Sequence, residues 1–483
     1  MSLWKQQVQI PRQKILQSDF HVQNVVIGGG MTGLLTAYFL QKKGQQVIVL
    51  EAQELASGQT GNTTAKITSQ HGFLYQNMVR RAGKDRACGY AMANEDAINF
   101  YEELIWEEGI ACHFERIPSY LYTTDQTKVK RLEKEADTAR KLGIRAHLVR
   151  GNKLEELPFA IAGAVCFRQQ AQFHPLEFMR ALAKKLTIYE HTKVLSVKEH
   201  AIEYESKEEI SQDKEDSVQE HKGTITADHI IFATHYPFVN IPGFYFLRQH
   251  QKRSYVLALE GEDIPQRLSG QYYSMDKDGL SFRSADGLLL MGGGSHRTGK
   301  HSCPNAEQKA EGYTYLRQMA QRYYPHSTEV FCWSAQDCMP HDRIPFIGRY
   351  SVFRPYWYVA TGFQKWGMTS AMVAASVLSD QICGIHNMYE AVFTPQRFLV
   401  CAGIQNLCID IGESTKGLIQ GMLTKSTKRC SHMGCKLVWN KEEQSWDCPC
   451  HGSRFSADGS LLDTPAQKDV EAILPPFKES HKE

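Results

Sequence analysis

Four cysteines and two histidines lie close together near the C-terminus, in the segments CSHMGC, which begins at Cys430, and CPCHGS, which begins at Cys448. Each segment offers one thiolate and one imidazole at the spacing of metal ligands, the histidines being His432 and His451. Two Cys and two His can hold tetrahedral zinc. Zinc fingers, however, group Cys with Cys and His with His. One of each per segment suits a two-iron cluster, with one iron on two thiolates and the other on two imidazoles. The spacing therefore predicts a metal centre and favours [2Fe–2S] over zinc.

A glycine-rich turn near the N-terminus has residues that could hold the phosphates of a dinucleotide. Gly28, Gly30 and Gly33 occupy the GxGxxG positions directly after the β-branched run at 24–27. The first glycine allows the tight turn, the second lets backbone approach a pyrophosphate, and the third permits close helix–strand packing. The N–H groups that begin the next helix face the phosphates. Glu51, 23 residues after Gly28, can accept hydrogen bonds from ribose hydroxyls.

The elements that must position this turn form a strand–helix–strand unit. The run at 24–27 is typical of a buried strand, and apolar residues recur at helical spacing over 34–40, with Gly44 placed to end the helix. The run at 47–50 is typical of a second, parallel strand. This βαβ unit predicts an α/β fold with a Rossmann-type sheet.

Further elements follow along the chain. The strongly charged segment 203–222 is expected to be a solvated hairpin or loop, and 224–234, 253–260, 287–291 and 356–361 are expected to be strands. A small-residue helix is expected over 369–382, directly after the loop 362–368.

Residues 22–395 resemble the FAD-dependent amine and amino-acid oxidoreductases of the D-amino-acid-oxidase and glycine-oxidase superfamily. Besides the glycine turn, the resemblance rests on the segment GQTGNTTAK at 58–66, on the strands near Val194 and Thr234, and on the loop 362–368, which opens a helix. In this family the helix N-terminus stabilises negative charge at the reduced flavin. The resemblance implies noncovalent FAD and these cofactor-binding residues: Gly28, Gly30, Met31, Thr32, Gly33, Glu51, Gly61, Thr63, Thr64, Ala65, Lys66, Val194, Thr234, Gly362, Trp366, Gly367 and Met368.

The same resemblance implies that the protein oxidises the C–H bond next to an amine nitrogen and passes a hydride equivalent to flavin. An arginine suits a substrate carboxylate because it can bind bidentately, and a lysine near flavin supplies positive charge. The candidates for substrate binding or catalysis are Arg253, Tyr255, His296, the turn His341–Arg343, and Lys365, of which we select Arg253, Tyr255, His341 and Lys365.

The two cysteine–histidine segments resemble the Rieske signatures CxHxGC and CxCHGS. The resemblance implies that Cys430 and Cys448 hold one iron and that His432 and His451 hold the other. It also implies a disulfide between the two remaining cysteines, Cys435 and Cys450, and a hydrogen bond from Ser453 to a bridging sulfide, which would raise the reduction potential.

One departure from the Rieske pattern concerns the strands that support the cluster loops. The helix-like segment 399–423 runs almost directly into Cys430, so the usual base strands are expected to be missing. The support must then come from the hairpin at 438–446, from later strands, or from the flavin domain. We therefore predict that residues 425–475 pack against the FAD domain.

These observations predict a chain with mixed α/β and α+β character. We expect a leader at 1–21 and, over 22–395, a Rossmann-type FAD-binding domain interleaved with an antiparallel-sheet substrate domain. A helical connector is expected at 396–424, followed by a small, shortened all-β Rieske domain at 425–483.

Composition limits the other possibilities. The 483 residues carry a net charge of +2, so no overall field attracts nucleic acid. Mean hydropathy is −0.40, no stretch approaches the ~20 apolar residues of a membrane helix, and the N-terminus lacks a signal-peptide core. We expect no integral membrane segment and a cytoplasmic location.

The predicted function is a dehydrogenase that oxidises an amine or amino-acid-like substrate at FAD, with electrons relayed through the cluster to an unidentified acceptor. One alternative is an oxidase that returns electrons to O₂ beside a defective or structural cluster domain. Another is a non-enzymatic redox-sensing or protein-binding module.

Overall fold

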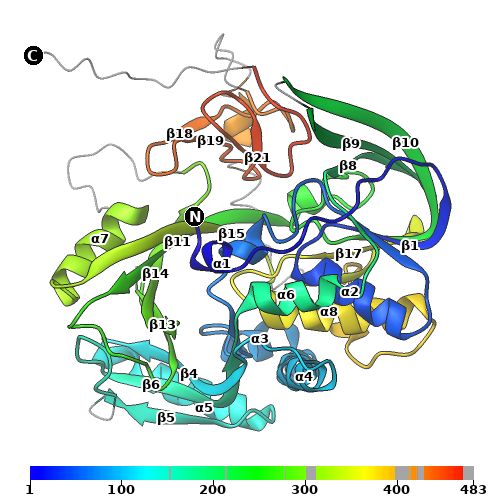
Figure 1. The fold of residues 1–483 in the computed structure, drawn as a ribbon. Coiled ribbons are helices and arrows are strands. Elements are labelled where there is room, and N and C mark those ends of the chain that lie inside the picture. Colours follow the sequence, from blue (N-terminus) through cyan, green and yellow to red (C-terminus); the bar gives the residue numbers. More distant parts are fainter. Residues whose placement is uncertain are drawn as a thin grey trace, which may run out of the picture.

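The computed structural model describes residues 1–151, 154–212, 215–277, 279–300, 312–397, 412, 415–419, 421 and 429–471. Within these residues the chain builds two large sheets and one small sheet, and the small sheet lies above the large ones in Figure 1. The predicted mixture of α/β and α+β structure with a small all-β region is confirmed.

The first sheet is the Rossmann-type sheet, with the order β16-β17-β10-β1-β2-β7. Its parallel pairs are β1 with β2, β1 with β10, β10 with β17, and β2 with β7. Val25, Val26 and Val49 are fully buried. Val26 and Val49 share a core with residues of the helices that cover one face of the sheet. Val25, on the other face, packs with Val194 and Ile202 of an antiparallel hairpin. The strands are β1 (His21–Ile27), β2 (Val47–Leu50), β7 (Ile188–Tyr189), β10 (Glu215–Phe232), β16 (Phe346–Ser351) and β17 (Arg354–Thr361).

A long antiparallel hairpin extends from this sheet, as the charged composition of 203–222 predicted. It consists of β8 (Thr192–Lys198), β9 (Ala201–Gln212) and the first part of β10, and it projects to one side of the molecule in Figure 1.

The second sheet has the order β15-β11-β14-β13-β12-β4-β6-β3, with β5 paired to β6. It is mostly antiparallel and forms the interleaved second part of the large unit. Its strands are β3 (Lys66–Ile67), β4 (Glu115–Thr123), β5 (Ala146–Arg150), β6 (Gly163–Gln172), β11 (Gln249–Glu260), β12 (Gln271–Ser274), β13 (Ser281–Ala285), β14 (Leu288–Arg297) and β15 (Thr328–Pro340).

Two helices position the cofactor turn, and both lie against the Rossmann-type sheet. Helix α2 (Met31–Lys42) begins at the glycine motif, and α8 (Gly367–Ile382) begins at the predicted flavin loop. They pack on one another, and the buried Ala371, Ala374 and Ala375 allow the close approach. The other helices are α1 (Leu3–Gln7), α3 (Tyr75–Ala82), α4 (Lys84–Glu107), α5 (Val129–Lys141), α6 (Pro175–Ala183), α7 (Gly312–Tyr323) and α9 (Glu390–Phe393).

The small sheet has the order β18-β19-β20-β21, with strands β18 (Val438–Asn440), β19 (Ser445–Asp447), β20 (Arg454–Phe455) and β21 (Leu461–Asp463). Each neighbouring pair is antiparallel. The expected connector at 396–424 falls mostly outside the described residues. Of its described positions, 412, 415–419 and 421 are helical and 396–397 are not.

The predicted leader contacts the large unit. Trp4 is buried, and its Nε1 donates to the carbonyl of Thr63 at 2.7 Å, while Ser2 donates to the carbonyl of Gly61. The first helix is therefore part of the wall behind the segment 58–66. None of the helices in the described part of the chain combines the length and apolarity needed to span a bilayer.

Candidate functional site

A cavity of about 690 Å³ lies at the carboxyl edge of β1 and β2, where open α/β sheets bind their ligands. Most of the predicted cofactor residues line it: Gly28, Gly30, Met31, Thr32, Glu51, Thr63, Thr64, Lys66, Val194, Thr234, Trp366, Gly367 and Met368. The structure thus gathers into one cavity segments that are more than 300 residues apart in the sequence.

The remaining four predicted cofactor residues lie outside the lining. A β-carbon on Gly33 would collide with the carbonyl oxygen of Gly28, so this glycine permits helix–strand contact. One on Gly61 would collide with the carbonyl oxygen of Ala56. Ala65 and Gly362 have positive φ values, 52° and 78°. These four residues do not face the cavity but set the backbone path of the segments that line it.

The glycine turn fits a dinucleotide. Gly28 has a φ of +113°, and a β-carbon there would lie 2.5 Å from the oxygen of Ala233 on the neighbouring strand. The first backbone N–H of α2, at Met31, faces the cavity edge and donates to the Thr60 hydroxyl at 3.0 Å. The half-buried Glu51 carboxylate accepts from the N–H of Gly29 at 2.7 Å, and desolvation raises the pKa of Glu51. Backbone N–H donors at a glycine turn and helix terminus, together with a carboxylate that can accept from ribose hydroxyls, are the groups that FAD requires.

Lys365 lies in the cavity and is held by an anion. Its Nζ lies 2.8 Å from Asp337 Oδ2 and also contacts the Ser254 hydroxyl, which donates to the same carboxylate at 2.6 Å. Burial favours the neutral amine, but the charge of Asp337, its hydrogen bond and the nearby Tyr273 together outweigh burial and raise the pKa of Lys365. Lys365 is therefore a permanent cation beside the cofactor space, consistent with its predicted role.

Arg253 occupies a different place from the one expected of a substrate ligand. It does not line the cavity. Its side chain is 3% exposed, and its Nη2 lies 2.6 Å from Glu443 while its Nη1 lies 3.5 Å from Asp463, both in the small sheet region. The neighbouring Lys252 and Ser254 line the cavity because side chains of a strand alternate between faces. The geometry favours a role for Arg253 in joining the two parts of the protein.

The other candidates for substrate binding or catalysis also fall into two groups, those that line the cavity and those that do not. Tyr255 lines the cavity and stacks on His296, with ring centroids 5.6 Å apart. Neither His296 nor His341 lines it. In the turn after His341, Asp342 pairs with Arg397 at 2.7 Å, and Arg343 contacts Gln364 at 3.4 Å. The geometry therefore favours a structural role for this turn.

Several cavity residues were missed by the sequence analysis, namely Lys252, Ser254, Tyr273, Gln336 and Asp337. They come from β11, β12 and β15, whose order in the sheet differs from their order in the sequence. The sequence of 252–256, KRSYV, has no apolar–polar alternation from which the cavity-facing side of β11 could have been identified.

The predicted cluster ligands form two contacting pairs, one of cysteines and one of histidines. Cys430 and Cys448 are buried within hydrogen-bond contact of each other, and the rings of His432 and His451 are perpendicular with centroids 5.0 Å apart. His432 Nδ1 is buried and has no hydrogen-bond partner among the described residues. Burial also lowers the pKa of His432 to about 4, so the imidazole is neutral, as a metal ligand must be. Two thiols and two imidazoles fit a Rieske [2Fe–2S] cluster.

The two ligand loops are joined covalently. Cys435 and Cys450 form a disulfide with a Cα–Cα distance of 6.7 Å, as the Rieske resemblance implied. Ser453 is fully buried beside Cys430, and its Oγ accepts from the N–H of Ala466 at 3.0 Å. The disulfide and Ser453 therefore hold the two ligand loops together at the predicted cluster site.

The cluster loops face the FAD domain, as predicted for residues 425–475. Gln251 Nε2 of β11 donates to the carbonyl of His451 at 2.8 Å, and Gln336 Nε2 of β15 donates to that of Gly452 at 2.7 Å. A β-carbon on Gly299 would collide with Pro449, so backbone meets backbone here. The FAD domain supplies the support that the expected loss of base strands requires.

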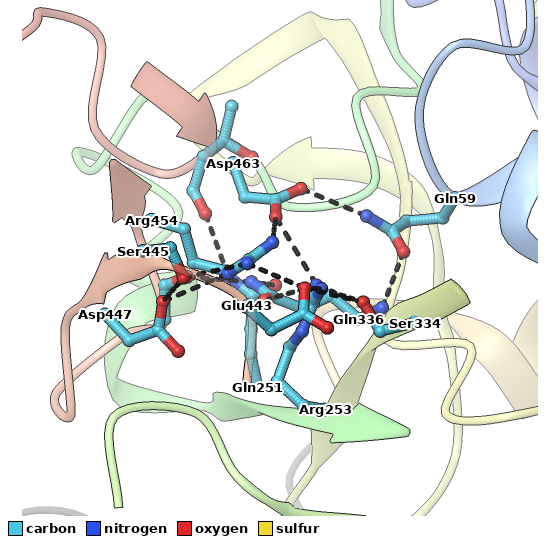
Figure 2. A network of polar contacts seen from close by, with 12 residues as sticks. Gln59, Gln251, Arg253, Ser334, Gln336, Glu443, Ser445, Asp447, Arg454 and Asp463 are labelled. Atoms are coloured by element: carbon cyan, nitrogen blue, oxygen red, sulfur yellow. Dashed lines mark hydrogen bonds and ion pairs between the residues drawn. The ribbon is translucent and has the colours of Figure 1, made fainter. Parts of the chain in front are cut away.

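Figure 2 shows a buried ionic network at this interface. Arg454 pairs with Asp447 at 3.1 Å, with Glu443 at 2.9 Å and with Asp463 at 2.9 Å. Glu443 and Asp463 in turn pair with Arg253 of the FAD domain. Because each buried charge has opposite partners, the network holds the small sheet in one orientation.

Comparison with known proteins establishes the class of protein. Residues 24–381 match the family of FAD dependent oxidoreductases, and residues 412–475 match the Rieske [2Fe-2S] domain. The chain therefore belongs to the FAD-dependent oxidoreductase family and carries a Rieske domain, and its cofactors are FAD and a [2Fe–2S] cluster. It is an enzyme of the oxidoreductase class.

Particular relatives share this organisation or part of it. The chain is 33% identical to the Rieske 2Fe-2S iron-sulfur protein YhfW of Bacillus subtilis (strain 168), over 97% of both chains. The large unit resembles glycine oxidase from Geobacillus kaustophilus, with 18% identity, a TM-score of 0.59, and coverage of 78% of this chain and 99% of that one. It also resembles L-amino acid deaminase from Proteus myxofaciens, with 17% identity, a TM-score of 0.60, and coverage of 81% and 97%. These two structures share the fold.

Proposed function

We propose that the protein is a dehydrogenase that oxidises an amine or amino acid in the FAD domain and passes the electrons through the docked Rieske domain to a further acceptor. When bound, FAD accepts a hydride and the cluster carries one electron at a time. The observation that carries the proposal is the placement of both predicted ligand histidines against the FAD domain. His432 contacts Asn240 at 2.9 Å, and His451 lies edge-on to Phe246 with centroids 5.8 Å apart.

The amine or amino-acid class of substrate rests on the cavity and on the fold relatives. Lys66, Lys252 and Lys365 all line the cavity. The ammonium group of Lys365, which Asp337 keeps charged, suits a substrate carboxylate, as an arginine does. Structures of similar fold have been described as glycine oxidase, L-proline dehydrogenase and L-amino acid deaminase. A structure described as L-alpha-glycerophosphate oxidase shares the fold as well, and it supplies a substrate without an amine for comparison.

The test is anaerobic reduction of the purified protein. Glycine, L-proline, a set of L-amino acids and glycerophosphate are mixed with it in turn, while flavin absorbance is followed and EPR spectra are recorded. The proposal expects an amine-containing compound to bleach the flavin and a reduced-cluster signal to follow. Cys430→Ser removes one iron ligand outside the cavity, so it should lose the EPR signal and keep the bleaching.

The same experiment separates the alternatives. An oxidase would bleach, give no cluster signal and produce H₂O₂ in air at a rate unchanged by Cys430→Ser. A non-enzymatic redox module would show no bleaching with any compound. The cytoplasmic location stays a prediction, which fractionation of the native cells tests.

A further inference from the structure

The C-terminal part of the Rieske region forms one wall of the FAD cavity. Strand β21 and the residues after it contribute Leu461, Leu462, Asp463, Thr464, Gln467 and Asp469 to the cavity lining. These residues lie on the opposite side of the domain interface from the glycine turn. The cofactor space is therefore enclosed by two parts of the chain that match different families.

Side chains of the FAD domain hold this wall in place. Gln59 Nε2 donates to Asp463 Oδ1 at 3.1 Å, Lys193 Nζ donates to the carbonyl of Gln467 at 2.9 Å, and Gln251 Nε2 donates to that of Thr464 at 2.9 Å. Gln59 and Lys193 themselves line the cavity. Gln59 also directly precedes Thr60, which caps the first N–H of α2 at Met31. The wall is thus tied to the anion-binding end of the cavity.

One acid group of the wall, Asp463, has its charge balanced by two arginines. Burial alone would raise the pKa of Asp463, but the Arg454 and Arg253 cations outweigh it and lower that pKa. Asp463 therefore stays ionised and paired, and its contacts point to both domains. Asp463 can therefore border a bound dianionic pyrophosphate without presenting an unpaired negative charge.

We propose that the Rieske region is a structural part of the FAD-binding site, so that FAD dissociates only when the segment 461–469 moves away from the cavity. By linkage, FAD in the cavity then stabilises the docked position of the Rieske region to the same extent. This inference rests on FAD binding and is independent of the substrate and of electron transfer.

The first experiment introduces opposite charges at one position of the wall in the full-length protein. Leu462 is 47% exposed, so a polar side chain is tolerated there. Leu462→Asp places an anion beside the cofactor space and Leu462→Lys places a cation. We expect the dissociation constant for FAD, measured by flavin fluorescence, to be about tenfold higher for the Asp variant than for the Lys variant. Equal dissociation constants in both variants and in wild type overturn the proposal.

A second measurement does not depend on a substitution. Hydrogen exchange is followed in the cluster-loaded protein after removal of FAD and again after FAD is restored. FAD should slow the exchange of amides in 461–469 and leave α5 unchanged, since α5 lies at the far end of the molecule in Figure 1. Exchange in 461–469 that is the same with and without FAD overturns the proposal. Iron content and the EPR signal verify that the Rieske region is folded in each sample.

Discussion

The imidazole of His432 donates from Nε2 to the amide oxygen of Asn240 at 2.9 Å, joining a predicted cluster ligand to the FAD domain. The opposite ring nitrogen, Nδ1, is buried without a hydrogen-bond partner among the described residues. An acceptor on the outer nitrogen fixes the tautomer of a ligating histidine and makes its metal-binding nitrogen more basic. Asn240 is therefore a positioning residue for the cluster, although it lies about 190 positions earlier in the chain.

Asn240→Leu should raise the reduction potential of the cluster. Loss of the acceptor removes electron density from His432, which favours the reduced state. If the bond contributes about 1 kcal/mol to the difference between the two redox states, the potential rises by about 40 mV. Asn240→Asp keeps an acceptor and adds negative charge, so it should lower the potential. The check is an EPR-monitored redox titration, and identical midpoints in all three proteins would contradict the role given to Asn240.

Arg253→Met should loosen the domain interface without affecting substrate binding. Glu443 and Asp463 keep Arg454 as a partner, so we expect a loss of about 2–3 kcal/mol in stability, seen as a lower thermal midpoint. KM should not change, because Arg253 does not line the cavity. Arg317→Met provides the control, since the Arg317–Glu329 pair is exposed and contributes less than about 1 kcal/mol. A raised KM with an unchanged midpoint would restore Arg253 as a substrate ligand.

Gly30→Val should remove FAD and leave the cluster. A β-carbon at Gly30 would lie 3.1 Å from Thr60 Oγ1, so alanine requires Thr60 to shift by a few tenths of an ångström. The added methyl groups of valine enter the space where backbone meets phosphate. We expect Gly30→Ala to keep most of its flavin and Gly30→Val to carry about tenfold less. Visible absorbance and iron analysis measure both cofactors, and full flavin in the valine variant would place the site elsewhere.

Lys66 should make the stability of the FAD-free protein depend on pH. Burial and the nearby Arg283 cation lower the pKa of Lys66 to about 7, whereas an unfolded lysine has a pKa of about 10.4. Between these values the unfolded chain binds more protons, so stability rises with pH over that window. Lys66→Met should therefore be more stabilised relative to wild type below pH 7, with the gap closing toward pH 10. Thermal unfolding at a series of pH values tests this, and a gap that does not vary with pH would contradict it.

The sequence by itself determined the local chemistry. Within each Rieske segment the cysteine and histidine ligands lie within a few residues of one another, and their spacing follows from bond geometry. The glycines of the dinucleotide turn are equally close together, and they are required by φ values that only glycine adopts easily. The βαβ unit is equally local, because hydrophobic periodicity shows each element without knowledge of its partners.

Tertiary structure decided which residues line the cofactor cavity and which join the two domains. Arg253 and Lys252 are adjacent in the sequence and project from the same strand, yet one pairs with Glu443 while the other lines the cavity. Local alternation shows that a strand has two faces but does not show what covers each face. The contact of Asn240 with His432 and the wall at 461–469 likewise depend on how two domains dock, and docking is set by long-range packing and buried charge pairing that no short segment of sequence encodes.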